Sequence, residues 1–386
     1  MKAIVFERYG APDVLALREI SKPLVKDDEV LVRIAAAAVN PYDWRIMRGD
    51  PYLVRLARGL RKPRAVTVLG SDMAGEVEAV GKDVTRFRPG DAVFGEVDSG
   101  GFAEYISIRN DLLGLKPVNL TFEQAAALPM TGITALQGLR DRGLIQAGQR
   151  VLINGASGGI GTMAVQLAKA FGAEVTGVCS SRNVDMVRSI GADHVVDYAR
   201  EDFTRSEQRY DLVLDTVGNH SLTAFRRALV SRGTLVIVGG GGGRWFGPAA
   251  QVLKAIVASP FVSQRLVPVL GTPNMADLLV LTELVEAGKV TPVIDRTYPL
   301  DEVPDAMRYV EMRHARGKVV ITVGTLPAPR LGSGQSFSAP ASASPAARAI
   351  GGFHRRAPKA EAHRSARVRP SSSARGPRRT GSQPAP

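Results

Sequence analysis

Cysteine is almost absent from this sequence of 386 residues, which contains only Cys179. A single thiol cannot form an internal disulfide or a multi-cysteine zinc site, and this scarcity is typical of a reducing compartment. Long hydrophobic runs are missing too. No stretch approaches the roughly 18 apolar residues of a membrane-spanning helix, and residues 1–10 contain no apolar signal-peptide core. The sequence therefore predicts a cytoplasmic protein with no membrane partner.

Acidic residues are scarce in one region only. Residues 324–386 hold eleven of the 50 basic residues but a single acid, Glu361, and so carry most of the net charge of +13. This segment is rich in Pro, Ser, Ala and Gly, and it cannot bury enough surface to offset its conformational entropy. We expect a disordered basic tail. A salt-sensitive arm for an anionic partner is the alternative, but Phe337 and Phe353 are too few aromatics for base stacking, so we expect no nucleic-acid partner.

The chain changes its pattern near residue 120. Residues 1–118 contain short alternating or β-branched runs separated by Gly, Pro and Asp, which favours a small β-barrel-like domain. The segment 121–139 then reads as a helix with Thr121 at its N-cap and Gln124 closing a capping box. Strands and helices alternate after it, and the apolar runs VLI, LVL and LVIV indicate a parallel sheet covered on both faces. The last elements, after Asn274, are expected to return to the first domain.

The clearest local motif is the segment 151–173, VLINGASGGIGTMAVQLAKAFGA. A strand runs into the glycines between Gly155 and Gly161 and then directly into an amphipathic helix. Glycines allow a tight turn and the close approach of backbone to a pyrophosphate, whose charge the helix N-terminus stabilises. The motif predicts a dinucleotide-binding site.

The residues after the next strand favour NADPH over NADH. About 20 residues beyond Gly161, where an acidic residue would bind the ribose 2′-hydroxyl of NAD, the chain reads Cys179-Ser180-Ser181-Arg182. A guanidinium pairs with a 2′-phosphate through charge-assisted hydrogen bonds. We therefore predict Arg182 at that phosphate, with a merely solvated helix-start residue as the alternative.

A second glycine run, 239–243, follows the strand TLVIV at the edge where such sheets bind ligands. Backbone without side chains can approach a nicotinamide ring there, so Gly239 and Gly240 are candidate cofactor contacts. The later glycines of the run read equally well as a flexible loop.

Seven ordered segments of residues 1–323 resemble the medium-chain dehydrogenase/reductases, and within them the zinc-independent quinone-oxidoreductase-like branch. They are VNPYDWRIMRG at 39–49, LGSDMAGEVEAVG at 69–81, RPGDAVFG at 88–95, GGFAEY at 100–105, AALPMTGITAL at 126–136, the glycine loop, and GADHVVDY at 191–198. The resemblance implies a GroES-like catalytic domain at 1–120, a Rossmann NADP-binding domain at 121–274, and a return to the catalytic domain at 275–323. The tail at 324–386 lies outside it.

The positions that hold zinc in the family's alcohol dehydrogenases lack zinc ligands here. A Cys stands there at or beside Asn40, a His-Glu pair at Ser71-Asp72 and another Cys near Thr131, and the four-cysteine structural lobe is missing from this chain. Zinc needs several converging nitrogen or sulfur ligands. We therefore expect no metal, and we read the scattered histidines as ordinary core or surface residues: His194, His220 and His314.

Without a metal, the resemblance implies hydride transfer from NADPH to a quinone or an α,β-unsaturated carbonyl. Asn40 is expected to contact nicotinamide or substrate, and Asp43 to order the loop around it. Tyr52, or Tyr42, is a candidate donor to the substrate oxygen, and water is the alternative proton source. Further residues implied to line the cofactor are Thr134, Ser157, Gly158, Gly159, Ile160, Gly161, Ser180, Arg182 and Tyr198, the last of which also reads as a packed aromatic.

Two other functions stay open. The basic stretch that follows Tyr52 would suit an enoyl-thioester reductase acting on acyl-CoA, although a solvated loop is the simpler interpretation of its side chains: Arg55, Arg58, Arg61, Lys62 and Arg64. An NADPH-binding structural or interaction protein with little turnover is the other. The run 263–270, SQRLVPVL, reads as a sheet-edge strand that could pair with its copy, so we expect a homodimer.

Overall fold

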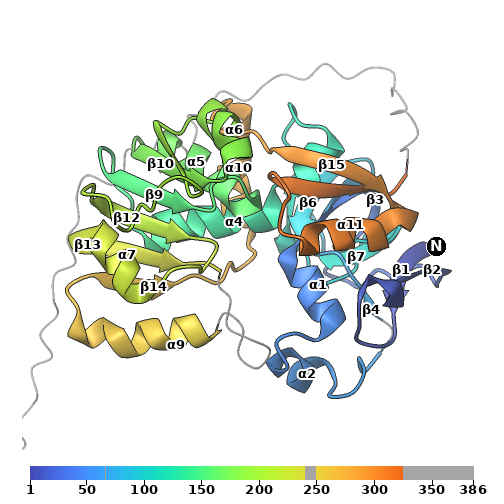
Figure 1. Cartoon of the computed structure of the whole chain (residues 1–386). Coiled ribbons are helices and arrows are strands. Elements are labelled where there is room, and N and C mark those ends of the chain that lie inside the picture. Colours follow the sequence, from blue (N-terminus) through green and yellow to red (C-terminus); the bar gives the residue numbers. More distant parts are fainter. Residues whose placement is uncertain (66, 240–248, 325–386) are drawn as a thin grey trace, which may run out of the picture. The chain divides into compact units, whose positions relative to one another are not determined.

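The computed structural model describes residues 1–65, 67–239 and 249–324 (Figure 1). The expectations for Gly240 and for the tail beyond Gly324 fall outside these residues. Within the described part of the chain, no helix is long and apolar enough to cross a membrane.

The first lobe is built on a seven-stranded sheet around the long strand β3 (Glu29–Val39). β3 is a run of Val, Ile, Leu and Ala with nearly every residue buried, as a central strand covered on both faces should be. The other strands of this sheet are β5 (Asp72–Val80), β6 (Ala92–Glu96), β7 (Tyr105–Arg109), β8 (Leu113–Leu115), β15 (Ile294–Pro299) and β16 (Lys318–Thr322). A small three-stranded sheet accompanies it, with β1 (Lys2–Phe6), β2 (Ala16–Glu19) and β4 (Thr67–Val68).

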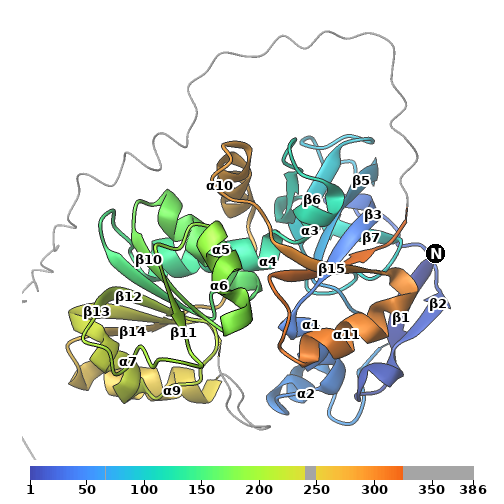
Figure 2. The ribbon, with the colours of Figure 1, turned by 45° about the horizontal axis from the view of Figure 1, so that its top comes forward.

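The end of the described chain returns to this first sheet. β16 pairs antiparallel with the second half of β3, with Val319 opposite Val39, while β7 pairs with the first half of β3 along the same side. β15 pairs parallel with β16, and helix α11 (Val303–Glu311) connects the two. Figure 2 shows these orange strands beside the blue and cyan strands from the start of the sequence. Strands from both ends of the described chain therefore share one sheet.

The second lobe is a six-stranded parallel sheet of order β11-β10-β9-β12-β13-β14. This is the doubly wound arrangement, and it confirms the predicted fold class. Its strands are β9 (Arg150–Asn154), β10 (Glu174–Cys179), β11 (His194–Asp197), β12 (Tyr210–Asp215), β13 (Leu229–Ile237) and β14 (Arg265–Pro268). β14 forms one edge of the sheet, as the sequence predicted for the run 263–270.

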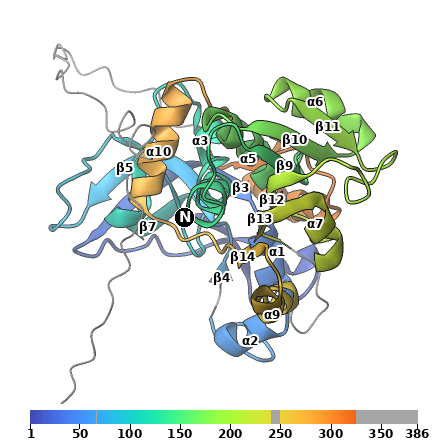
Figure 3. The same ribbon diagram turned by 90° about the vertical axis from the view of Figure 1, so that its left-hand side faces the viewer.

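Helices cover both faces of the parallel sheet, which explains its apolar strands. Val151 and Ile153 pack into one buried cluster with residues of α5, while Leu152 between them packs into another with Phe225 of α7. The helices of the chain are α1 (Pro41–Arg48), α2 (Leu53–Arg58), α3 (Phe122–Ala126), α4 (Pro129–Gln137), α5 (Gly159–Ala170), α6 (Val184–Ser189), α7 (Leu222–Ala228), α9 (Ala249–Ala258), α10 (Met275–Glu286) and α11. α10 contacts both α4 and β8, and α9 contacts the edge strand β14 (Figure 3).

The helix expected at 121–139 is two helices. Thr121 does cap α3 with the predicted capping box, its hydroxyl accepting from the backbone N–H of Gln124 at 3.2 Å. The helix stops at Ala126, and α4 starts at Pro129. Proline has no N–H to continue a helical ladder but suits a first helical position. The apolar periodicity spans the break, which is why the sequence pattern missed it.

Candidate active site

The glycine loop has the geometry that its sequence predicted. β9 ends at Asn154, Gly155 adopts a left-handed φ of 87°, and α5 begins at Gly159. A Cβ on Gly161 would overlap the carbonyl oxygen of Gly155 and lie 2.8 Å from Cα of Ala156. A Cβ on Gly158 would meet only the Gly155 oxygen, at 3.5 Å. The loop is thus packed tightly at Gly161 and has open space beside the Cα of Gly158, the form of a pyrophosphate cradle.

The residues predicted to distinguish NADPH from NADH lie at the carboxyl ends of β10 and β11. Ser180 directly follows β10, and Arg182 is exposed, with its guanidinium donating to the carbonyl oxygen of His314 at 2.9 Å. Tyr198 follows β11 with 62% of its surface exposed, which does not fit the packed-aromatic alternative.

Asp197 is a carboxylate at this edge that the sequence reasoning overlooked. It lies opposite Cys179 across the two strands and accepts from the Ser181 hydroxyl at 2.6 Å. That hydrogen bond, with others from neighbouring groups, lowers the pKa of Asp197. The strand pairing, rather than the spacing from Gly161, is the signal that would have revealed it.

Gly239 and Thr134 both have close packing neighbours. A Cβ on Gly239 would come within 2.5 Å of the carbonyl oxygen of Thr216, so a side chain there has no room. Thr134 is buried in α4, and its hydroxyl faces Gly271. Thr131, one helical turn earlier, faces the glycine loop, since a Cβ on Gly159 would lie 3.0 Å from its methyl group.

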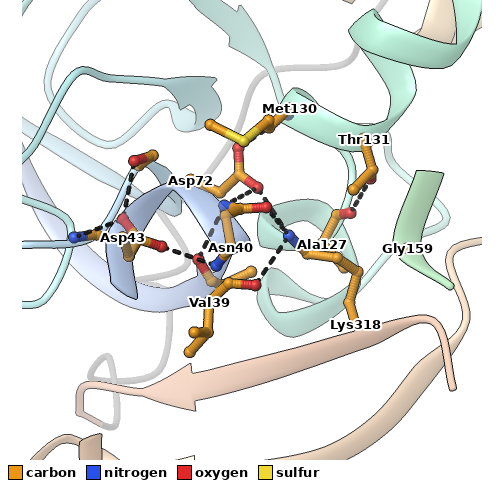
Figure 4. A network of polar contacts seen from close by, with 12 residues as sticks. Val39, Asn40, Asp43, Asp72, Ala127, Met130, Thr131, Gly159 and Lys318 are labelled. Atoms are coloured by element: carbon orange, nitrogen blue, oxygen red, sulfur yellow. Dashed lines mark hydrogen bonds and ion pairs between the residues drawn. The ribbon is translucent and has the colours of Figure 1, made fainter. Parts of the chain in front are cut away.

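A buried polar network connects the first lobe to that loop (Figure 4). The Lys318 ammonium donates to the side-chain oxygen of Asn40 at 2.5 Å, to Oδ2 of Asp72 at 3.1 Å and to the carbonyl oxygen of Val39 at 3.3 Å. The Asn40 amide donates to the same Asp72 oxygen at 2.9 Å. The other Asp72 oxygen accepts from the backbone N–H of Met130 at 2.9 Å. This network fixes the orientation of the Asn40 carboxamide.

Asp43 holds the chain around Asn40. Its carboxylate accepts from the backbone N–H of Asn40 at 2.7 Å, from the Ser71 hydroxyl at 2.9 Å and from the backbone N–H of Gly70 at 3.2 Å. Burial raises the pKa of Asp43 to about 7, although these hydrogen bonds favour the ionised form. Asp43 therefore links the start of α1 to the residues before β5.

Glu96 adds a further buried carboxyl beside the network. It ends β6 directly opposite Asp72 in β5. Among the described residues its Oε2 has no hydrogen-bond partner, and its pKa is raised to about 8, first by burial and then by the nearby charge of Asp72. Of the three carboxyls, Asp72 pairs with the Lys318 ammonium at 3.1 Å, and the charge of Lys318 also lowers the pKa values of Asp43 and Glu96 against the effect of burial.

The two candidate tyrosines contact groups outside this network. Tyr42 donates to Asp98 at 2.6 Å, and burial, followed by this hydrogen bond, raises its pKa to about 12. The ring of Tyr52 lies 4.8 Å from the guanidinium of Arg55. Two of the five basic residues of the stretch are held internally: Arg55 donates to Gly49 and Arg48 carbonyls, and Arg58 to Asp98.

An apolar cavity of about 410 Å³ lies between α1 and α2. Its lining residues are Tyr42, Arg45, Ile46, Pro51, Val54, Ala57 and Arg58. Most of this lining is hydrocarbon, and Arg45 and Arg58 are the basic residues in it.

Metal ligands do not converge in the part of the chain that the structure describes. No group of three or more His, Cys, Asp or Glu side chains there is placed to hold an ion. The positions expected to lack zinc ligands, Asn40, Ser71-Asp72 and Thr131, are instead hydrogen-bonded to protein groups.

Lys318 and Asp72 are candidate site residues that sequence reasoning missed. The sequence pattern marked Asp72 only as a position without a zinc ligand, and it did not single out Lys318. A lysine at the head of a strand buried on both faces was the available signal, because an unpaired charge is not tolerated there.

Two domain families match the sequence. The alcohol dehydrogenase GroES-like domain matches residues 26–118, and the family described as zinc-binding dehydrogenase matches residues 190–321. A quinone-oxidoreductase homolog from spinach chloroplasts is 34% identical over 334 residues, covering 83% of this chain and 98% of the relative. An NADPH-dependent alkenal/one oxidoreductase from Arabidopsis thaliana is 35% identical and covers 83% and 79%. The crystal structure of Escherichia coli quinone oxidoreductase complexed with NADPH superimposes with a TM-score of 0.72 at 25% identity, covering 84% and 100%.

Proposed function

The chain belongs to the quinone-oxidoreductase-like branch of the medium-chain dehydrogenase/reductases, and from this we propose that it is an NADPH-dependent oxidoreductase that reduces quinones or α,β-unsaturated carbonyls. The observation that carries the proposal is the meeting of the glycine loop with the buried network of Lys318, Asn40 and Asp72. A cofactor held by the loop would have its reacting end beside these residues.

The residues of the loop fit a dinucleotide. The open backbone beside Gly158 and the N-terminus of α5 would hold the pyrophosphate, with Ser157, Gly159, Ile160 and Gly161 completing the turn. When bound, NADPH supplies the hydride. Asn40 orients the reacting end, because its amide donates to Asp72 and to the carbonyl oxygen of Ala38 and is thereby held in one orientation. Asp43 keeps Asn40 in that place.

NADPH is proposed over NADH because Ser180 and Arg182 lie at the strand ends where the adenosine ribose would bind. Among the described residues, the exposed guanidinium of Arg182 donates to one carbonyl oxygen, that of His314, so it has donors left for a phosphate. Asp197 is an acid at this edge, and an acid there would favour NADH. Its oxygens, however, already accept from the Ser181 hydroxyl and from the backbone N–H of Ala199.

We propose chemistry without zinc, since oxygen and amide groups occupy the ligand positions. Hydride delivery to a conjugated acceptor does not require a metal to polarise an alcohol. The cavity between α1 and α2 is the proposed acceptor pocket. Tyr52 stays a candidate proton donor, and water is the second source.

A homodimer is the proposed assembly, in the cytoplasm as the single buried thiol suggests. β14 is an edge strand, and a row of exposed apolar side chains lies beside it on α9 and the turn that follows. They are Leu253, Ile256, Val257 and Phe261, each more than half exposed. A second copy that covered them would remove an apolar patch from water.

An enoyl-thioester reductase is the second candidate. Arg61, Lys62 and Arg64 are exposed and have no ion pair among the described residues, so they could attract the phosphates of coenzyme A.

The test is NADPH oxidation by the purified protein with a panel of quinones, enones and enoyl-CoA thioesters, repeated with NADH and with a chelator. Chelator-insensitive turnover with NADPH supports the proposal, and the best acceptor separates quinone or enone from thioester. Tight NADPH binding with no turnover on any acceptor would replace it with the binding-protein function.

A further inference from the structure

Lys318 is a buried ammonium with all three of its protons in use. Its side chain is only 3% exposed, and its acceptors come from the end of β3, from Asn40 and from β5. An ammonium has three donors and no acceptor. Lys318 therefore has no proton to offer a substrate unless one of these hydrogen bonds breaks, and its geometry is that of a support.

The backbone at Lys318 is joined to the cofactor loop. The N–H of Gly317 donates to the carbonyl oxygen of Ser157 at 2.8 Å, and Gly158 and Gly317 form a parallel bridge. The stem of Lys318 lies against the same loop, since a Cβ on Gly159 would be 3.1 Å from its Cδ. Any movement of the loop therefore reaches Lys318 through one residue of backbone.

We propose that Lys318 is a positioning residue that ties the phosphate loop to the Asn40 carboxamide, so that the docked loop sets the orientation of that carboxamide. The inference rests on the proposed function, because it assigns Asn40 to the reacting end of the cofactor. It gives a role to a side chain that touches neither cofactor nor substrate.

The charges around Lys318 show what its loss would do. Asp72 from β5 pairs with it directly, and Glu96 from β6 and Asp43 from α1 interact with its charge. A neutral replacement leaves the Asp72 carboxylate buried without its counter-ion, which is strongly destabilising. A test must therefore separate the loss of charge balance from the loss of orientation.

The experiment compares Lys318→Met with the double variant Asp72→Asn/Lys318→Met, which removes both charges of the pair. Lys289→Met, at an exposed lysine between α10 and β15, is the matched control. We expect both Lys318 variants to lower kcat by about 100-fold, the effect of a small misplacement of reacting groups, with a larger primary isotope effect from NADPH deuterated at the transferred position. The Kd for NADPH should change little, whereas the fluorescence of bound NADPH should shift because its nicotinamide is held differently.

A double-mutant cycle tests whether Lys318 acts through Asn40. If it does, the kcat of Asn40→Ala/Lys318→Met should equal that of the slower single variant, because the effects are not additive. Multiplying losses would overturn the proposal. So would recovery of both melting temperature and turnover in Asp72→Asn/Lys318→Met, because Lys318 would then only balance buried charge.

The two proposals fail in different ways. If the wild type binds NADPH but transfers hydride to none of the acceptors tested, the proposed function fails, and the fluorescence of bound NADPH still tests Lys318. If the wild type turns over normally and Lys318→Met matches Lys289→Met in kcat and fluorescence, only the positioning role fails.

Discussion

Two glycines of the same loop should respond to alanine in opposite ways. A methyl group on Gly161 would overlap the Gly155 carbonyl oxygen. The backbone fixes the position of a Cβ, and the oxygen itself belongs to the backbone, so neither can swing aside. Overpacking of this kind costs about 1–3 kcal/mol of unfolding free energy. A methyl group on Gly158 meets only one atom at an ordinary 3.5 Å, at a φ of −84° that alanine accepts, so Gly158→Ala should stay within about 0.5 kcal/mol of the wild type.

Gly158→Ala should weaken NADPH binding although it leaves the stability of the fold almost unchanged. The methyl group of Gly158→Ala would occupy the open space in which the pyrophosphate is proposed to lie, and we expect the Kd for NADPH to rise by about tenfold or more, equivalent to at least about 1.4 kcal/mol. Thermal unfolding without cofactor measures the first effect, and fluorescence titration with NADPH measures the second. Tight NADPH binding by Gly158→Ala would show that the open backbone is not the cradle, and wild-type stability of Gly161→Ala would refute the packing argument.

Three further predictions concern charge, specificity and assembly. Glu96 has a raised pKa in the fold, so its contribution to the free energy of unfolding is complete at low pH. That contribution is lost as the pH rises from about 4.3 toward its folded pKa of about 8. Glu96→Gln should therefore remove at least about 1.4 kcal/mol of this pH dependence, as measured by denaturant unfolding at a series of pH values. Arg182→Ala should lower kcat/KM for NADPH by about tenfold or more while leaving NADH unchanged, because one charged hydrogen-bond donor contributes about 1.5–3 kcal/mol; equal losses with both cofactors would contradict this. Ile256→Glu should shift the protein toward the monomer in sedimentation, and an unchanged molecular mass would show that α9 is not in the interface.

The sequence predicted the features that depend on local patterns along the chain, and it missed the contacts between residues far apart in the sequence. The apolar runs and the glycine loop gave the parallel sheet and its helices, because those signals lie within about 20 neighbouring residues. Lys318 lies 278 residues from Asn40, and Asp72 meets Lys318 only because two strands pair with β3. Such contacts depend on strand register, which a single sequence does not contain.

Other differences have local causes. The apolar period of 121–139 continues across Pro129 although the helix does not, since periodicity records burial and not hydrogen bonding. Asp197 does not lie at the spacing of about 20 residues after Gly161 that is typical of an acid at the ribose, because it reaches the same edge from the neighbouring strand. The domain boundaries at 120 and 274 stay predictions, and α10, which contacts both α4 and β8, lies directly after the second.

The pairing of β16 with β3 has a consequence for the order in which the two lobes can fold during synthesis. β3 leaves the ribosome early, but the strand that completes one side of it is among the last described segments to be synthesised. Domains tend to fold as units during synthesis, so the parallel-sheet lobe can form while residues 36–39 still expose an unpaired edge. A nascent chain stopped before Lys318 would therefore combine a folded cofactor lobe with an incomplete first sheet, the state most exposed to aggregation and proteolysis.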